Sequence, residues 1–156
     1  MNKIAVFPGS FDPITIGHES VVHRALELFD KIIIAIGHNE NKKGFFPLAV
    51  RLAMITDVFA GNPKIEVTHF EDLTVDFCKR NGAKYILRGL RTSADFEFER
   101  AIAQVNKVMY DELESVFLLT LPEHTSINST IVREILRYGG DAHQFLPQSI
   151  DLKKYL

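Results

Sequence analysis

Short apolar segments alternate along this chain with longer segments in which apolar residues recur at helical spacing. The short segments are rich in Val, Ile and Phe, which is typical of β-strands. We expect strands at five places: Lys3–Phe7, Lys31–Ile36, Lys64–Phe70, Lys84–Leu87 and Ser115–Thr120. Because each of them is a nearly continuous apolar run, both faces of the resulting sheet should be covered.

The intervening segments carry the helical period. Apolar residues recur at spacings of three and four over 22–29, 48–59, 98–109 and 131–136. A shorter helix over Thr74–Arg80 should end at Asn81-Gly82, because glycine commonly terminates helices. Alternating strands and helices favour right-handed crossovers and a parallel sheet. We therefore expect a single Rossmann-like, doubly wound α/β domain over residues 1–156, with a five-stranded parallel sheet and helices on both faces.

Charge and cysteine content exclude several classes of protein. A formal charge of -2 over 156 residues gives no overall basic field, which argues against nucleic-acid and anionic-membrane partners. The one cysteine, Cys78, excludes a disulfide framework, and its place on an apolar helix face indicates a buried thiol. The apolar run Ile4–Phe7 is too short for a signal peptide. These features favour a soluble protein of the cytoplasm.

The segment after the first strand is the first candidate site. Pro8–His18 holds two prolines and two glycines in eleven residues, which predicts a tightly shaped loop. Ligands of parallel α/β folds bind at the carboxyl ends of the strands. His18 falls in the first helical turn, where free N–H groups favour an anion and disfavour a charged imidazole. On position alone, a histidine packed beneath the loop is an equally good interpretation, and Asp12 fits a structural role better than a chemical one.

Two more segments place cations and hydroxyls at strand ends. Arg88-Gly89-Leu90-Arg91 follows the fourth expected strand, and arginine offers a forked grip on phosphate. Ser129 and Thr130 open the last amphipathic helix, where we expect them to serve as N-caps beside free N–H groups. Taken alone, the two arginines fit surface ion pairs with Asp95 or Glu97, and Lys42-Lys43 fits a solvated loop. The sequence has no Walker A motif and no GxGxxG fingerprint, which disfavours P-loop NTPases and dinucleotide oxidoreductases.

Two of these motifs resemble signatures of the nucleotidyltransferase superfamily, which is related to class I aminoacyl-tRNA synthetases. Thr15-Ile16-Gly17-His18 resembles its [T/H]xGH motif, and Ile127–Arg133 resembles its ISSTxxR motif. The first loop, Arg88–Arg91 and the following Asp95–Glu99 narrow the resemblance to the bacterial phosphopantetheine adenylyltransferase family. The similarity covers essentially the whole chain.

The resemblance implies transfer of the adenylyl group of ATP to 4'-phosphopantetheine, giving dephospho-coenzyme A and pyrophosphate, the penultimate step of coenzyme A biosynthesis. It assigns stabilisation of the transition state to His18. The ATP-contacting positions it implies are Ser10, Phe11, His18, Gly89, Leu90, Arg91, Glu99, His124, Thr125, Ser126, Ile127, Asn128, Ser129 and Thr130. The acceptor-contacting positions it implies are Ser10, Lys42, Thr74 and Arg88.

The resemblance also implies a Mg²⁺ ion carried on the ATP phosphates, with no metal-ligating residue, and a homohexamer. Three positions depart from the family pattern. Ser10 stands where Thr is frequent, Asn128 replaces a Ser, and His124 stands where Trp is frequent. Because Ser10 keeps the hydroxyl, we expect little change there. Because the hydroxyls of Ser129 and Thr130 remain, we expect Asn128 and His124 to affect the fine geometry of adenine binding rather than the activity.

The implied chemistry agrees with the residues present. The nucleophile is an already ionised phosphate oxygen, so catalysis needs positioning and charge neutralisation rather than a general base. A related nucleotidyltransferase that uses nicotinate mononucleotide or glycerol 3-phosphate remains an alternative, against which Lys42 and Arg88–Arg91 argue. A non-catalytic nucleotide sensor is a second alternative, and the intact His18 argues against it. The net charge disfavours a third, a small RNA-binding domain.

Overall fold

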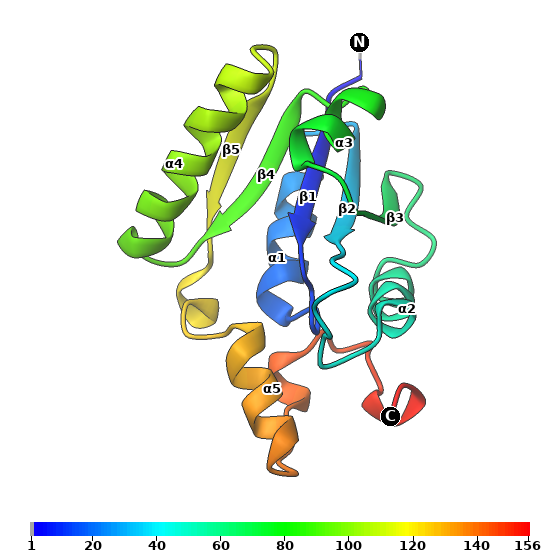
Figure 1. The fold of residues 1–156 in the computed structure, drawn as a ribbon. Coiled ribbons are helices and arrows are strands. Elements are labelled where there is room, and N and C mark those ends of the chain that lie inside the picture. Colours follow the sequence, from blue (N-terminus) through cyan, green and yellow to red (C-terminus); the bar gives the residue numbers. More distant parts are fainter. Residues whose placement is uncertain (1) are drawn as a thin grey trace.

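Five parallel strands form one twisted sheet in the order β3-β2-β1-β4-β5 (Figure 1). The computed structural model describes residues 2–156. Its strands are β1 (Ile4–Gly9), β2 (Lys31–Gly37), β3 (Ile65–Phe70), β4 (Tyr85–Leu90) and β5 (Glu114–Leu119). All neighbouring strands pair in parallel. The order reverses between β1 and β4, which makes their carboxyl ends the switch point at which α/β folds bind ligands.

Helices cover both faces of the sheet, which confirms the expected fold class. They are α1 (Ile16–Ala25), α2 (Leu48–Val58), α3 (Thr74–Arg80), α4 (Ser93–Met109) and α5 (Ser129–Arg137), with 3-10 turns at Pro122–His124, His143–Phe145 and Leu152–Lys154. Helices α1 and α2 pack on one face, and α3 and α4 lie on the other (Figure 1). Helix α5 and the C-terminal segment lie beyond the carboxyl ends of the strands.

Strands β1 and β4 extend two and three residues further than the sequence pattern predicts. Pro8 and Gly9 were expected to begin the loop, yet they continue β1 in register with Ala35 and Ile36 of β2. Arg88 likewise lies within β4, opposite Phe117 of β5. Pairing with a neighbouring strand carries the backbone past residues whose own preference is for turns. The Pro8 carbonyl and the Arg88 side chain are therefore held by the sheet, not by a loop.

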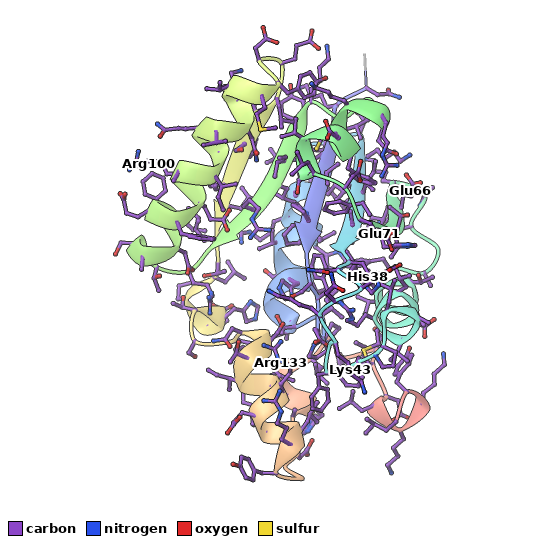
Figure 2. The ribbon with its side chains drawn as sticks, in the orientation of Figure 1. His38, Lys43, Glu66, Glu71, Arg100 and Arg133 are labelled. Carbon is purple, nitrogen blue, oxygen red and sulfur yellow. The ribbon has the colours of Figure 1, made fainter. Side chains whose placement is uncertain are left out.

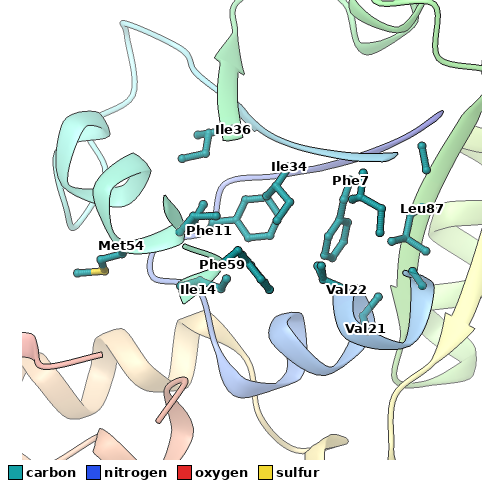
Figure 3. Close-up of a cluster of buried hydrophobic side chains, with 14 of the residues drawn as sticks. Phe7, Phe11, Ile14, Val21, Val22, Ile34, Ile36, Met54, Phe59 and Leu87 are labelled. Atoms are coloured by element: carbon teal, nitrogen blue, oxygen red, sulfur yellow. The ribbon is translucent and has the colours of Figure 1, made fainter. Parts of the chain in front are cut away.

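Strand β2 shows why the sheet needs cover on both sides. Ile32, Ile34 and Ile36 pack with α1 and α2, and Ile34 and Ile36 are visible in that cluster in Figure 3. Ile33 and Ala35 point to the opposite face and pack with α3. All five side chains are fully buried. The uninterrupted apolar run of the sequence thus corresponds to a strand buried on both faces.

Helix α4 differs from the other helices because its apolar stripe is exposed to solvent. None of its residues is buried, and Phe98, Val105 and Val108 are 67%, 59% and 86% exposed. The sequence left open whether this stripe belongs to the core or to a subunit interface, and within one chain it is not core.

No helix within residues 2–156 is long and apolar enough to span a membrane.

Replacing Ile34 should destabilise the fold strongly, because the side chain is fully enclosed between the sheet and two helices. Ile34→Ala is expected to lower the free energy of unfolding in urea by about 2–5 kcal/mol, the usual cost of a large-to-small core substitution. The matched control is Leu156→Ala, which removes a 79% exposed side chain and should change stability by less than about 0.5 kcal/mol. Similar losses for both variants would contradict this description of the core.

Candidate active site

A cavity opens at the switch point between the carboxyl ends of β1 and β4. The loop after β1, the first turn of α1, the end of β4, the start of α4 and the segment before α5 all line it. The cavity gathers ten of the residues that the sequence singled out, namely Ser10, Phe11, His18, Arg88, Gly89, Arg91, Glu99, Ile127, Asn128 and Ser129. Segments more than 100 residues apart in the chain therefore meet at one place.

The start of α1 fixes the orientation of His18. Thr15 is the N-cap, and its hydroxyl accepts a hydrogen bond from the His18 backbone N–H at 3.4 Å. In return, the Thr15 backbone N–H donates to Nδ1 of the His18 ring at 2.9 Å. A backbone amide can only donate, so Nδ1 must accept, and a neutral ring then carries its proton on Nε2. The helix cap thus selects the tautomer of His18.

His18 is also kept neutral. Burial, together with the nearby positive charges of Arg88 and Arg91, lowers the pKa of its imidazole from 6.5 to about 4. The sequence predicted a disfavoured cation, which agrees in direction with this finding, although burial rather than the helix dipole is the leading cause. Phe11 packs edge-on against the ring, with 5.0 Å between ring centroids, and contributes to this desolvation. At neutral pH the ring is therefore an uncharged N–H donor.

Arg88 is anchored on three sides of its guanidinium. Its Nε and Nη2 donate to the two carboxylate oxygens of Glu99 at 2.9 and 2.7 Å, and its Nη1 donates to the carbonyl of Pro8. The residues taken alone fitted an ion pair of Arg88 with Asp95 or Glu97, but the partner in the structure is Glu99. Glu99 lies one helical turn further along α4 than Asp95, opposite the end of β4. The forked geometry fixes the plane of the guanidinium.

Arg91 is held at the start of α4. Its Nε lies 3.3 Å from the Asp95 carboxylate, which also accepts the Arg91 backbone N–H at 3.1 Å. Here the sequence-based interpretation of an ion pair with Asp95 agrees with the structure. Thr92 caps α4 by accepting from the Asp95 backbone N–H. Both arginines thus reach the cavity with one carboxylate partner each, and both lie close enough to His18 to depress its pKa.

The N-cap of α5 is Asn128, so the prediction that Ser129 or Thr130 would cap this helix was wrong. The Asn128 side chain accepts from the Ile131 backbone N–H at 2.9 Å. Ser129 instead donates its hydroxyl to the carbonyl of Pro13 at 2.8 Å. Asparagine is as good an N-cap as serine, because its short side chain reaches the same amide. The departure at Asn128 therefore preserves the helix start that borders the cavity.

A second cavity adjoins the first on the face covered by α3 and α4. Its lining combines apolar side chains with a few polar ones: Phe70, Ile86, Phe98, Ile102 and Phe117 together with Thr74, Asn106 and Ser115. Pro8, Gly9, Arg88 and Glu99 line both cavities. The Arg88–Glu99 pair thus stands where a polar cavity meets a more apolar one.

Six of the singled-out residues line neither cavity: Lys42, Leu90, His124, Thr125, Ser126 and Thr130. Lys42 is exposed on the loop between β2 and α2, and Leu90 is buried in the sheet. His124 lies beside Gly17, and its buried Nδ1 finds no hydrogen-bond partner among the described residues.

Cys78 is fully buried, and burial raises the pKa of its thiol to about 11, as expected for a core thiol.

Sequence reasoning missed Asn106 of α4 and two β5 residues, Ser115 and Phe117, in the second cavity. A signal for one of them was present. Asp95, Glu99, Ile102 and Asn106 follow one another at spacings of three and four, which places them along one helix face.

Within residues 2–156, no group of three or more His, Cys, Asp or Glu side chains is arranged to hold a metal ion.

Comparisons with known proteins agree with this geometry. The family model described as cytidylyltransferase-like matches residues 6–135. A phosphopantetheine adenylyltransferase from Cytophaga hutchinsonii is 47% identical over 96% of this chain and 100% of its own length. Another, from Flavobacterium johnsoniae, is 49% identical over 96% of this chain and 98% of its own. The chain belongs to the phosphopantetheine adenylyltransferase family.

Solved structures support the fold at greater distance. A bifunctional NMN adenylyltransferase/ADP ribose pyrophosphatase from Francisella tularensis superimposes with a TM-score of 0.74 at 21% identity. The match covers 98% of this chain, which spans about half of that protein, 47% of its length. The same protein, complexed with AMP and a manganese ion, gives a TM-score of 0.72. At this identity the likeness shows that this chain shares its fold with that part of the Francisella protein.

The depressed pKa of His18 predicts a pH-dependent stability. The unfolded chain binds a proton on His18 below about pH 6.5, whereas the folded protein does so only near pH 4, so stability should fall as the pH drops through that window. Relative to His18→Gln, the wild type should lose up to about 3 kcal/mol between pH 6.5 and pH 4. Urea unfolding of both proteins at several pH values measures the difference, and parallel stability profiles would contradict the buried, neutral state of His18.

Proposed function

We propose that this protein transfers the adenylyl group of ATP to 4'-phosphopantetheine, releasing pyrophosphate and forming dephospho-coenzyme A in the cytoplasm, with residues 1–156 acting as one nucleotidyltransferase domain. The observation that carries the proposal is the pairing of a polar, cation-lined cavity with an apolar one at the switch point, in a chain nearly half identical to enzymes of that name. ATP fits the polar cavity, and an extended acceptor with a phosphate at one end fits the other.

The reaction needs charge neutralisation more than proton transfer. A phosphate oxygen of the acceptor attacks the α-phosphorus of ATP, and the bond from that phosphorus to the bridging oxygen of pyrophosphate breaks. Both partners are anions, so their repulsion and the charge of the pentacoordinate transition state must be offset. His18 presents its Nε2–H to the nucleotide phosphates, and Arg88 and Arg91 supply fixed positive charge beside it. The neutral ring contributes a directed hydrogen bond to a phosphate oxygen, and the positive charge comes from the two arginines.

The two substrates are assigned to separate groups of residues. For ATP we propose contacts from the first loop, from the end of β4 and α4, and from the segment before α5: Ser10, Phe11, His18, Gly89, Leu90, Arg91, Glu99 and residues 124–130. For the acceptor we propose Ser10, Lys42, Thr74 and Arg88. Thr74 and Arg88 line the second cavity, which supports their assignment. Lys42 lies on an exposed loop and would have to turn toward the bound acceptor.

A divalent cation, Mg²⁺, would enter with the ATP. The two carboxylates that line the polar cavity are already engaged, Glu99 by Arg88 and Asp95 by Arg91. The ion's ligands would then be phosphate oxygens and water, in keeping with the preference of Mg²⁺ for few protein ligands. When bound, it would supply further neutralisation of the phosphate charge.

We also propose a homohexamer. The open apolar stripe of α4 supports it, since Phe98, Val105 and Val108 would be covered by another subunit. Light scattering on the purified protein tests the proposal, and a particle of about one 17.7 kDa chain would refute it.

The acceptor is tested by following pyrophosphate release with ATP and Mg²⁺ and a panel of acceptors. We expect release with 4'-phosphopantetheine and none with nicotinate mononucleotide or glycerol 3-phosphate. Release only with one of the other acceptors would keep the mechanism and refute the substrate assignment. Absence of release with all three would favour a nucleotide-binding protein without turnover.

Removing the His18 side chain should slow the reaction far more than it weakens nucleotide binding. For His18→Ala we expect kcat to fall at least about 10²–10³-fold, while ATP affinity stays within about tenfold, because the donor acts mainly on transition-state charge. Steady-state kinetics and calorimetry provide the two numbers. His143→Ala is the matched control, since this histidine is 80% exposed and lines neither cavity. A His18→Ala enzyme with a tenth of the wild-type kcat would contradict the assignment.

A further inference from the structure

Two charged side chains are buried outside the contacts used above. Asp12 and Arg51 are only 7% and 6% exposed. Buried charges are rare in proteins and persist where hydrogen bonds satisfy them. Both side chains form hydrogen bonds with backbone groups, and neither lines a cavity described above.

The Asp12 carboxylate holds the end of the loop between β2 and α2. Its Oδ2 accepts from the Phe45 backbone N–H at 2.7 Å, and its Oδ1 accepts from the Phe46 backbone N–H at 2.8 Å. Charge-assisted bonds to two successive amides fix both the position and the direction of this backbone. Lys42 lies three residues before Phe45, and Figure 2 shows Lys43 of the same loop at the same end of the molecule as Arg133 of α5.

Arg51 of α2 connects that loop to residues 10–15, the loop after β1, which is called the nucleotide loop because Ser10 and Phe11 are assigned to ATP. Its Nε donates to the Phe46 carbonyl at 3.0 Å, and its Nη1 donates to the Ser10 carbonyl at 2.9 Å. Both backbone polar groups of Phe46 are thus engaged, the N–H by Asp12 and the carbonyl by Arg51. One guanidinium therefore bridges the backbone of Ser10 and the anchored end of the Lys42 loop.

Gly44 gives independent evidence that the cluster is tightly built. A Cβ at this position would lie 2.9 Å from the Phe46 carbonyl oxygen, 3.1 Å from Asp12 Oδ2 and 3.3 Å from Arg51 Nη2. Only glycine lets the loop approach the two charged groups so closely. Arg133 adds a bond from its Nη1 to the Asp12 carbonyl at 2.8 Å, which secures the nucleotide loop from α5.

We propose that Asp12 and Arg51 are positioning residues of the adenylyl transfer, which set the Lys42 loop in register with Ser10 so that acceptor and nucleotide meet at His18. The inference rests on the proposed function. Its physical basis is the conformational entropy that is lost when a loop becomes ordered on binding. A lysine on a free loop pays this cost when it binds a phosphate, whereas a loop that is already anchored binds the phosphate without it. The Asp12 carboxylate binds only the backbone of the Lys42 loop, whereas Arg51 binds the backbone of both loops.

The two roles predict different kinetic patterns. In Asp12→Asn one of the two amides faces an NH₂ group instead of an oxygen, so we expect KM for 4'-phosphopantetheine to rise about tenfold while KM for ATP changes less than about threefold. Gly44→Ala should give the same pattern while retaining both charged groups. Arg51→Lys keeps the charge but cannot reach two carbonyls in different directions, so we expect both KM values to rise.

Phe59→Leu is the matched structural control. Phe59 follows α2, is buried in the same core, and makes no contact with either loop backbone through hydrogen bonds. It should lower Tm without changing either KM. Variants at Asp12, Gly44 and Arg51 that lose activity only in proportion to their loss of Tm, as Phe59→Leu does, would overturn the positioning role.

Two readouts without turnover separate this inference from the proposed function. Amide hydrogen exchange at Phe45 and Phe46 should be faster in Asp12→Asn, and calorimetry should show weaker binding of 4'-phosphopantetheine with nearly unchanged binding of ATP. Unchanged acceptor affinity despite faster exchange would refute the positioning role. A wild type that binds 4'-phosphopantetheine through this loop but releases no pyrophosphate would refute the proposed reaction alone.

Discussion

The hydrogen bond from the Thr15 amide to Nδ1 of His18 is the contact on which the site depends. It is part of the N-terminal cap of α1, so forming the helix also sets the ring's orientation and leaves the proton on Nε2. Burial against Phe11 and the two arginines keep the ring uncharged by lowering its pKa to about 4. A local rule of helix capping thus produces a hydrogen-bond donor of fixed direction on a side chain that lines the cavity at the switch point.

The rest of the fold brings cations to that donor and limits their freedom. The reversal of strand order puts the Pro8 carbonyl of β1 beside Arg88 of β4, and Glu99 of α4 completes the grip on the guanidinium. Because the same pair borders both cavities, one rigid element separates the space assigned to the nucleotide from that assigned to the acceptor. Asp12 and Arg51 limit in the same way the freedom of the loop between β2 and α2, by hydrogen bonds to its backbone.

The sequence predicted the architecture well, because continuous apolar runs and helical periods report directly on burial. It also predicted that His18, Arg88 and Arg91 lie near one another at the carboxyl ends of the strands. It failed where tertiary pairing overrides local preference, as at Pro8-Gly9, which continue β1, and at Glu99, whose pairing with Arg88 requires the packing of α4 on the sheet. At the start of α5, Asn128 is the N-cap, while the Ser129 hydroxyl donates to the Pro13 carbonyl, 116 residues earlier in the chain. No local sequence pattern reveals this long-range contact.

The central claim is that His18 is a neutral Nε2–H donor selected by its helix cap. Nitrogen-15 NMR of the histidine-labelled protein, with His18→Gln used to assign the signals, tests it directly. Between pH 6 and pH 8 we expect Nδ1 of His18 to show the signal of an unprotonated ring nitrogen and Nε2 that of a protonated one, with no titration near pH 6.5. A ring protonated on Nδ1, or one that titrates near pH 6.5, would contradict the account.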